Sequence, residues 1–171
     1  SDSVWNVNPD NDTVTKIDAT ALSKLGEYNV GDNPRSLAID SSGNIWVVNQ
    51  NDASISVLSA SSGSTLETIA LPHASAPYGI AFNPSLTLAY VTLEASGELL
   101  EIDASTRSIM RSVIIGSTPR GIAVTHDDAK IFVTRFISPS NIGEVTEIDA
   151  STLTTSSVIA LSKDSGPDTP S

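Results

Sequence analysis

The feature that most constrains the fold of this chain is an internal repeat of about 42 residues. Four aromatic-led segments recur with spacings of 41, 44 and 42 residues: 5–8, 46–49, 90–93 and 132–135. A second, alternating column follows each of them, as in residues 99–103. Columns that agree in order and spacing indicate a fold built by stacking copies of one small unit.

Two further columns complete each unit. A proline-led segment precedes the aromatic one in three copies, at residues 34–39, 77–82 and 119–124. An apolar segment closes each copy, at residues 25–30, 66–71, 109–115 and 158–161. The segments are short and rich in Val, Ile, Thr and aromatic residues, and turn-forming clusters separate them. Four short antiparallel strands per unit of about 40–45 residues predict a β-propeller blade.

The sequence resembles the YVTN β-propeller repeat family, within the surface-layer-like and lactonase-like propeller superfamily. Residues 119–124 (Pro-Arg-Gly-Ile-Ala-Val), 46–49 (Trp-Val-Val-Asn) and 99–103 (Leu-Leu-Glu-Ile-Asp) carry this resemblance, which extends over about residues 4–161. Some positions depart from the usual Gly, Asn or Asp of the repeat: Ser36, Leu93, Arg135 and Ser59. The resemblance implies that the proline-led strand lines the central channel and that the aromatic strand lies second.

The predicted fold is therefore an all-β propeller of about four antiparallel four-stranded blades over residues 1–161. Residues 4–30 supply a partial blade without its inner strand, and the full blades are 34–71, 77–115 and 119–161. Residues 162–171 read as a loop or linker tail. An open arc exposes apolar blade faces, so we expect either the remaining blades of a larger propeller chain or a second copy to close the ring.

Composition excludes several classes of function. The net charge of −11, from 9 basic and 20 acidic side chains, is unsuited to binding a phosphate backbone. The chain has no cysteine, which rules out a disulfide framework and cysteine-ligated metals within it. No apolar run is long enough for a membrane-spanning helix. The sequence contains no phosphate loop, nucleophile elbow or zinc-protease motif, and no catalytic residue is assigned.

Candidate ligand-binding residues come from one column. Arg35, Tyr78 and Arg120 each follow the proline of an inner strand, so a propeller brings them together at the channel mouth. Two guanidiniums and a phenol suit a carboxylate or another anion. The alternative is that each arginine pairs with a nearby carboxylate, such as Asp32 or Glu94.

A four-residue insertion within 135–143 lies on the same rim. Arg135 and Phe136 complete the candidate ligand-binding set, and Phe136, Ile137 and Pro139 would give the insertion an apolar tip for ligand or partner contact. The alternative is a loop that packs on a neighbouring blade.

Other recurrent residues have structural interpretations. The aromatics that lead the second strands are expected between blades, and Asp18, Asp103 and Asp149 are expected to cap turns. Asp10 and Asp12, within residues 8–13, belong to the best calcium-like cluster, but it lacks the Gly and distal Glu of a calcium loop. We therefore predict no cofactor, with calcium at Asp10 and Asp12 as a weak candidate.

These features favour a non-catalytic propeller module that binds a ligand or a protein, or serves as a scaffold. The resemblance implies an exported protein, whether extracellular, periplasmic or at the cell surface. The alternative is an enzyme of lactonase or lyase type, or a redox-associated propeller, with the channel mouth as active site. A lactonase of this architecture would place a metal among Glu, Asp and Asn, whereas the inner strands here offer Arg, Tyr and Arg.

Overall fold

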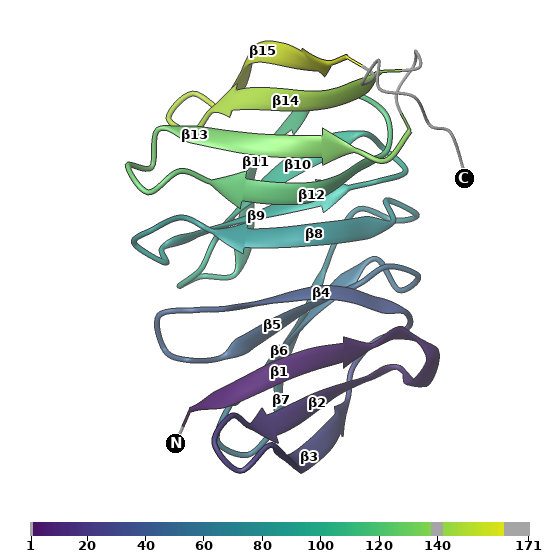
Figure 1. Cartoon of the computed structure of the whole chain (residues 1–171), viewed down its shortest axis with the longest axis vertical. Coiled ribbons are helices and arrows are strands. Elements are labelled where there is room, and N and C mark those ends of the chain that lie inside the picture. Colours follow the sequence, from purple (N-terminus) through teal and green to yellow (C-terminus); the bar gives the residue numbers. More distant parts are fainter. Residues whose placement is uncertain (1, 138–141, 163–171) are drawn as a thin grey trace, which may run out of the picture.

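The computed structural model of the chain describes residues 2–137 and 142–162. Within them the strands form four antiparallel sheets, one of three strands and three of four. The sheets follow one another as blades of an arc, with β1–β3 at one end and β12–β15 at the other (Figure 1). This arrangement confirms the predicted all-β propeller fold. Within the described residues the first blade has three strands, and the other three blades have four.

Each blade comes from one stretch of the chain. Blade 1 contains β1 (Ser3–Asn8), β2 (Thr13–Asp18) and β3 (Ser23–Asn29), with a 3₁₀ turn at Pro9–Asn11. Blade 2 contains β4 (Pro34–Ile39), β5 (Ile45–Asn49), β6 (Ser54–Leu58) and β7 (Thr65–Ala70). Blade 3 contains β8 (Pro77–Phe82), β9 (Leu88–Leu93), β10 (Glu98–Asp103) and β11 (Ser108–Ile114). Blade 4 contains β12 (Pro119–Val124), β13 (Lys130–Arg135), β14 (Gly143–Asp149) and β15 (Thr154–Leu161).

The proline-led strands are the inner strands. Neighbouring strands pair in chain order within every blade, so β4, β8 and β12 each lie at one edge of their sheet. β8 contacts both β4 and β12, and the three lie side by side along one side of the arc (Figure 1). The residues directly after the three prolines therefore gather at one rim.

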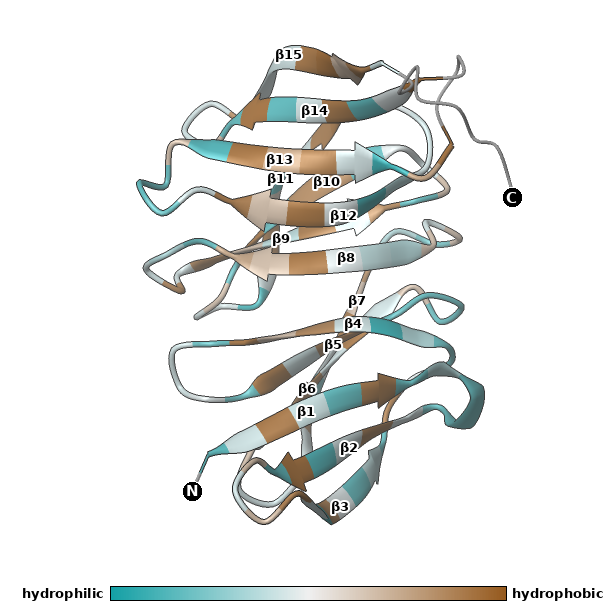
Figure 2. Ribbon diagram, viewed as in Figure 1, coloured by the Kyte–Doolittle hydropathy of each residue, from teal (hydrophilic) through white to brown (hydrophobic). Residues whose placement is uncertain are grey.

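Strand alternation gives each blade two packing faces. One face carries the aromatic residue of the second strand and is turned toward the next blade; we call it the leading face. Trp46 of blade 2 packs there with Val91 and Leu93 of blade 3, in a buried apolar cluster. Tyr90 of blade 3 likewise packs with Ile131 and Val133 of blade 4. Figure 2 shows that apolar residues recur within the strands of each blade.

Phe132 differs from the other three aromatics. Trp5, Trp46 and Tyr90 are buried between blades, as the sequence predicts, whereas Phe132 is only partly buried. The reason is that Phe132 lies on the leading face of the last blade described, where no further blade covers it.

The glycine of the Pro-x-Gly segment is required by the close approach of neighbouring inner strands. A Cβ at Gly79 would overlap the backbone carbonyl oxygen of Arg120 in the next blade. The Thr92 hydroxyl accepts a hydrogen bond from the Gly79 N–H (2.8 Å) and donates one to that carbonyl (3.0 Å). In blade 2, Ser36 replaces the glycine, and its own hydroxyl donates to the Tyr78 carbonyl (2.6 Å). Each of the two interfaces between complete blades thus supplies one hydroxyl to the backbone carbonyl of the residue after the proline.

Candidate functional site

The structure brings Arg35, Tyr78 and Arg120 together at the rim where the inner strands begin. The Arg120 guanidinium carbon lies 4.6 Å from the centroid of the Tyr78 ring, and that of Arg35 lies 5.7 Å from the same ring. Both distances are within the range of cation–π attraction. Tyr78 therefore contacts a cation from each neighbouring blade.

A hydrogen-bonded chain runs beside this stack. Arg35 Nε donates to Gln50 Oε1 (2.7 Å), and Gln50 Nε2 donates to Glu94 Oε2 (2.8 Å). The other oxygen of Glu94 accepts from Arg120 Nε and Nη2. Arg35 and Arg120 are thus joined twice, through the phenol ring and through the amide–carboxylate chain, so their positions depend on one another.

The two arginines share a single carboxylate. Glu94 forms an ion pair with Arg120 (2.8 Å) and reaches Arg35 only through the neutral amide of Gln50. Asp32 instead accepts from the Asn51 side chain and makes no ion pair with Arg35 within the described residues. In that same part of the chain, the terminal nitrogens Nη1 and Nη2 of Arg35 have no hydrogen-bond partner. The rim therefore keeps a positive charge at Arg35.

Phe136 joins the stack and Arg135 does not. The Arg120 guanidinium carbon lies 3.4 Å from the Phe136 ring centroid, while the Phe136 side chain stays 60% exposed. Arg135 turns away toward Glu144 (2.7 Å) and the Ile115 carbonyl (3.2 Å). Pro139 of the expected apolar tip lies outside the described residues.

Gln50 and its contact with Glu94 were not predicted from the sequence, which indicated only Glu94 as a possible partner of an arginine. A signal for them exists, because Gln50, Glu94 and Phe136 each directly follow the second strand of their blade. The rim therefore consists of two repeat columns: the residue after the inner-strand proline and the residue after the second strand. We call the six residues Arg35, Tyr78, Arg120, Gln50, Glu94 and Phe136 the rim cluster.

Asp10 and Asp12, the weak calcium candidates, have different surroundings in the structure. Asp12 Oδ1 accepts a hydrogen bond from the Asn33 backbone N–H (2.8 Å), which ties blade 1 to the loop before β4, whereas Asp10 is exposed. Among residues 2–137 and 142–162 there is no group of three or more His, Asp or Glu side chains arranged to hold a metal ion.

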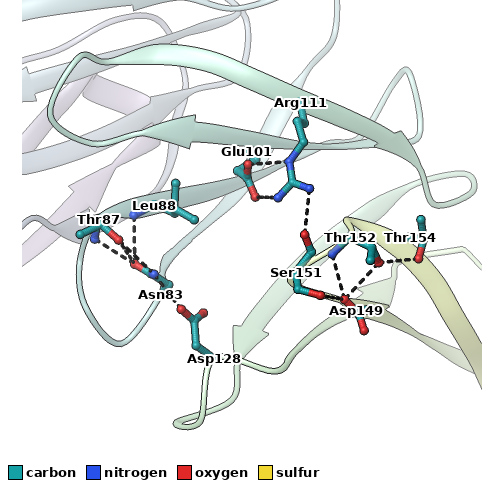
Figure 3. Close-up of polar contacts among 10 residues, drawn as sticks. All are labelled: Asn83, Thr87, Leu88, Glu101, Arg111, Asp128, Asp149, Ser151, Thr152 and Thr154. Carbon is teal, nitrogen blue, oxygen red and sulfur yellow. Dashed lines mark hydrogen bonds and ion pairs between the residues drawn. The ribbon is translucent and has the colours of Figure 1, made fainter.

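The opposite rim holds turn-capping carboxylates (Figure 3). Asp149 Oδ1 accepts from the Thr152 N–H (2.9 Å) and the Ser151 hydroxyl (2.6 Å), and Asp103 caps the equivalent turn of blade 3. These hydrogen bonds lower the pKa of both carboxyls to about 2, with the bond from the Thr106 N–H as the largest cause at Asp103 and that from the Ser151 hydroxyl at Asp149. Their role is structural.

An ion pair within blade 3 lies near this rim, and its arginine also contacts blade 4 (Figure 3). The carboxylate of Glu101, 1% exposed, accepts two hydrogen bonds from Arg111, and Arg111 Nη1 also donates to the Ser151 carbonyl of blade 4 (3.1 Å). Burial, and secondarily the negative charge of Glu101, raise the pKa of Tyr90 to about 12. Every strong hydrogen-bonding group of this pair is used internally, so the rim cluster remains the better candidate for ligand binding.

The blade topology defines the chain as a β-propeller. Solved structures similar to it have the same fold: Kuenenia stuttgartiensis hydrazine synthase has a TM-score of 0.86 at 21% identity, over 93% of this chain and 46% of that one. Staphylococcus aureus virginiamycin B lyase has a TM-score of 0.74 at 18% identity, over 97% of this chain and 53% of that one. A chain of the mitotic checkpoint complex has a TM-score of 0.72 at 19% identity, over 87% and 48%.

These likenesses concern the fold alone. This chain spans about half the length of the solved structures it matches. No protein-family model matches the sequence, and no curated protein matches it either. Within the residues that the structure describes, no helix is long and apolar enough to cross a membrane.

Proposed function

We propose that this chain is part of a non-catalytic binding module of YVTN-type propeller repeats, and that its rim cluster binds an anionic group. The repeat assignment is supported by the strand order within each blade and by the Pro-x-Gly packing at β8. An exported, periplasmic or cell-surface location, and completion of the ring by further blades or by a second copy, belong to the same proposal. They are supported by the resemblance and by the uncovered leading face at Phe132.

The observation that carries the ligand proposal is the charge balance at Arg35. The rim cluster contains two guanidiniums and one carboxylate, and that carboxylate, Glu94, forms its ion pair with Arg120. Arg35 is oriented by Gln50 and Tyr78, and its Nη1 and Nη2 are open within the described residues. A planar fork with two free donors fits a carboxylate bidentately. Arg120 then serves to position Tyr78, and Phe136 stacks on Arg120 at the far end of the rim cluster.

The test is a calorimetric titration with citrate as the carboxylate probe and inorganic phosphate as a second anion, at low ionic strength. Replacing Arg35 by Gln keeps a polar side chain but removes the fork, and should weaken citrate binding about tenfold or more. Arg107→Gln is the matched control, because Arg107 lies on the opposite rim and pairs with Glu67. Equal citrate affinity in Arg35→Gln and the unmodified protein would overturn the site.

The alternative class is an enzyme of lactonase or lyase type that uses the same channel mouth. Two other measurements distinguish this alternative from the binding proposal: the divalent-metal content of the purified protein and its hydrolysis of simple lactones. Stoichiometric bound metal together with lactone turnover would replace the binding proposal.

A further inference from the structure

The last residue of the aromatic-led strand differs from blade to blade. In chain order the equivalent residues are Asn8, Asn49, Leu93 and Arg135. In blade 3, Leu93 is fully buried in the apolar cluster that joins blades 2 and 3. In blade 4, Arg135 forms its ion pair with Glu144. Blades 1 and 2 place an asparagine at this position, and the surroundings of the two asparagines differ.

Blade 1 shows how an asparagine at this position finds its partners. Asn8 Nδ2 donates to the hydroxyls of Thr13 (3.0 Å) and Thr15 (2.9 Å). Asn8 Oδ1 accepts from Asn6 Nδ2 (2.9 Å), and the Thr13 hydroxyl donates to Glu27 (2.7 Å). The network therefore ends in a donor, Asn6, on one side and in an acceptor, Glu27, on the other.

Blade 2 repeats the centre of this network without its two ends. Asn49 Nδ2 donates to the hydroxyls of Ser54 (3.0 Å) and Ser56 (2.9 Å). Within the described residues, Asn49 Oδ1 has no hydrogen-bond partner and neither hydroxyl donates to an acceptor. Val47 stands where blade 1 has its donor, and Thr68 where it has its acceptor. The asparagine and both serines are buried, so leaving these groups unpaired is costly.

These groups lie beside a cavity between the end of β3 and strands β6 and β7. Its volume is about 310 Å³, and its walls include Gly31, Asp52, Ser54, Ser56 and Thr68. Asn49 and Asp52 converge on Gly31, because a Cβ there would lie 2.7 Å from Asn49 Nδ2 and 2.5 Å from Asp52 Oδ2. One water molecule takes up about 30 Å³ of liquid, so the cavity has room for a larger ligand.

The free hydrogen-bonding groups define the chemistry of that ligand. Asn49 Oδ1 needs a donor, whereas the hydroxyls of Ser54 and Ser56 need an acceptor. Asp52 Oδ2 accepts from the Asp32 backbone N–H (2.7 Å), and the other oxygen of Asp52 has no partner within the described part of the chain. An ammonium group only donates, and a carboxylate only accepts and would be repelled by Asp52. A hydroxyl group both donates and accepts, so it fits all of these groups.

We propose that this cavity binds a saccharide through adjacent hydroxyls. One hydroxyl donates to Asn49 Oδ1 and accepts from Ser54 or Ser56, and a neighbouring hydroxyl donates to the Asp52 carboxylate in a charge-assisted hydrogen bond. A pyranose ring holds adjacent hydroxyls rigidly, which limits the entropy lost on binding. The cavity lies at the outer strands and uses no residue of the rim cluster, so this site stands independently of the anion site.

The test follows the side-chain amide of Asn49 by NMR in the ¹⁵N-labelled protein. The probes are the methyl α-glycosides of glucose, galactose and mannose, each added to about 50 mM, a range that detects millimolar affinity. With at least one of them, the Asn49 amide and the backbone amides of residues 52–56 should shift saturably. Glycerol at the same concentration should cause no saturable shift.

A variant that supplies the missing acceptor sharpens the test. Thr68→Glu copies the acceptor that blade 1 has in Glu27, and should pair with the hydroxyls beside Asn49. It should weaken glycoside binding about tenfold or more, because the ligand must displace a charge-assisted hydrogen bond. Ser112→Glu is the matched control, since Ser112 holds the same position in blade 3 but lies opposite Leu100. This control should bind the glycoside as the unmodified protein does.

The proposal is contradicted by the absence of saturable shifts with all three glycosides, or by equal shifts with glycerol. Equal glycoside affinity in Thr68→Glu and Ser112→Glu would also contradict it, because the acceptor would then have no role. Saturable shifts with ammonium chloride but with none of the glycosides would replace the saccharide site by a cation site.

Discussion

The guanidinium carbon of Arg120 lies 3.4 Å from the centroid of the Phe136 ring, and Glu94 binds the same guanidinium at its edge. Arg120 is thereby satisfied by its neighbours, both by charge and by stacking. Arg35 at the other end of the rim cluster is held by the neutral groups of Gln50 and Tyr78. This difference makes Arg35 the ligand-binding arginine and Arg120 the positioning one.

The Phe136–Arg120 contact should contribute measurably to stability. We expect Phe136→Ala to lower the free energy of unfolding in urea by about 0.5–1 kcal/mol, the usual size of a partly exposed cation–π contact. Ile137→Ala is the control, because Ile137 is equally exposed and its aliphatic side chain has no aromatic ring to stack on a cation. Equal losses in the two variants would mean that the stack has no energetic role.

Gly79 and Gly121 are equivalent positions with different neighbours. Gly79→Ala places a methyl group against the Arg120 backbone carbonyl and should cost about 1–3 kcal/mol of stability, as overpacking does. Gly121→Ala meets the Thr134 hydroxyl at 2.7 Å, on a side chain that can rotate, and should cost clearly less. Urea denaturation of both variants measures the difference, and an equal cost would refute the close approach of β8 and β12.

Removal of Arg111 should strongly destabilise blade 3 and its contact with blade 4. Arg111→Ala leaves the buried carboxylate of Glu101 unpaired and should cost about 3 kcal/mol. Glu101→Ala should cost less, because the Arg111 side chain is 38% exposed and can be solvated, and the double variant should lose much less than the sum of the two. Thermal unfolding of the two single variants and the double variant, compared with the unmodified protein, completes this double-mutant cycle. Additive losses would show that the two side chains do not interact.

Acid stability should depend on the turn-capping aspartates. Hydrogen bonds hold the pKa of Asp103 and Asp149 at about 2, below the value of 3.8 for a free aspartate. Their stabilising contribution is therefore present above about pH 4 and is lost as the pH falls toward 2. The double variant Asp103→Asn/Asp149→Asn should show a shallower loss of unfolding free energy over that range. Asp10→Asn, outside these turns, should keep the original slope, and a matching slope in all three proteins would contradict the assignment.

Much of the fold could be predicted because each strand recurs at the same place in every copy of the sequence repeat. The spacing of Trp5, Trp46, Tyr90 and Phe132 placed one strand of each blade, and the shared proline column placed Arg35, Tyr78 and Arg120 at one rim. Residues at the same position of successive repeats occupy the same place in successive blades, so the repeat predicts which residues lie close together.

The position of a residue in the repeat does not predict which hydrogen-bond or ion-pair partner its side chain takes. The sequence indicates Glu94 as a possible partner of an arginine, but nothing in it decides that Glu94 binds Arg120 and that Arg35 binds Gln50. The inward turn of Arg135 toward Glu144 is likewise a rotamer choice made by the local packing. The exposure of Phe132 follows from the position of its blade at the end of the arc.

The most direct test of the anion site observes Arg35 itself. In a protein labelled with ¹⁵N at arginine, the Nε–Hε resonances of Arg35, Arg107 and Arg120 can be assigned from the corresponding lysine variants and followed during a citrate titration. The Arg35 resonance should shift saturably, that of Arg120 less, and that of Arg107 should stay unchanged. A resonance of Arg35 that stays in place at saturating citrate, or equal shifts at Arg35 and Arg107, would contradict the proposed binding site.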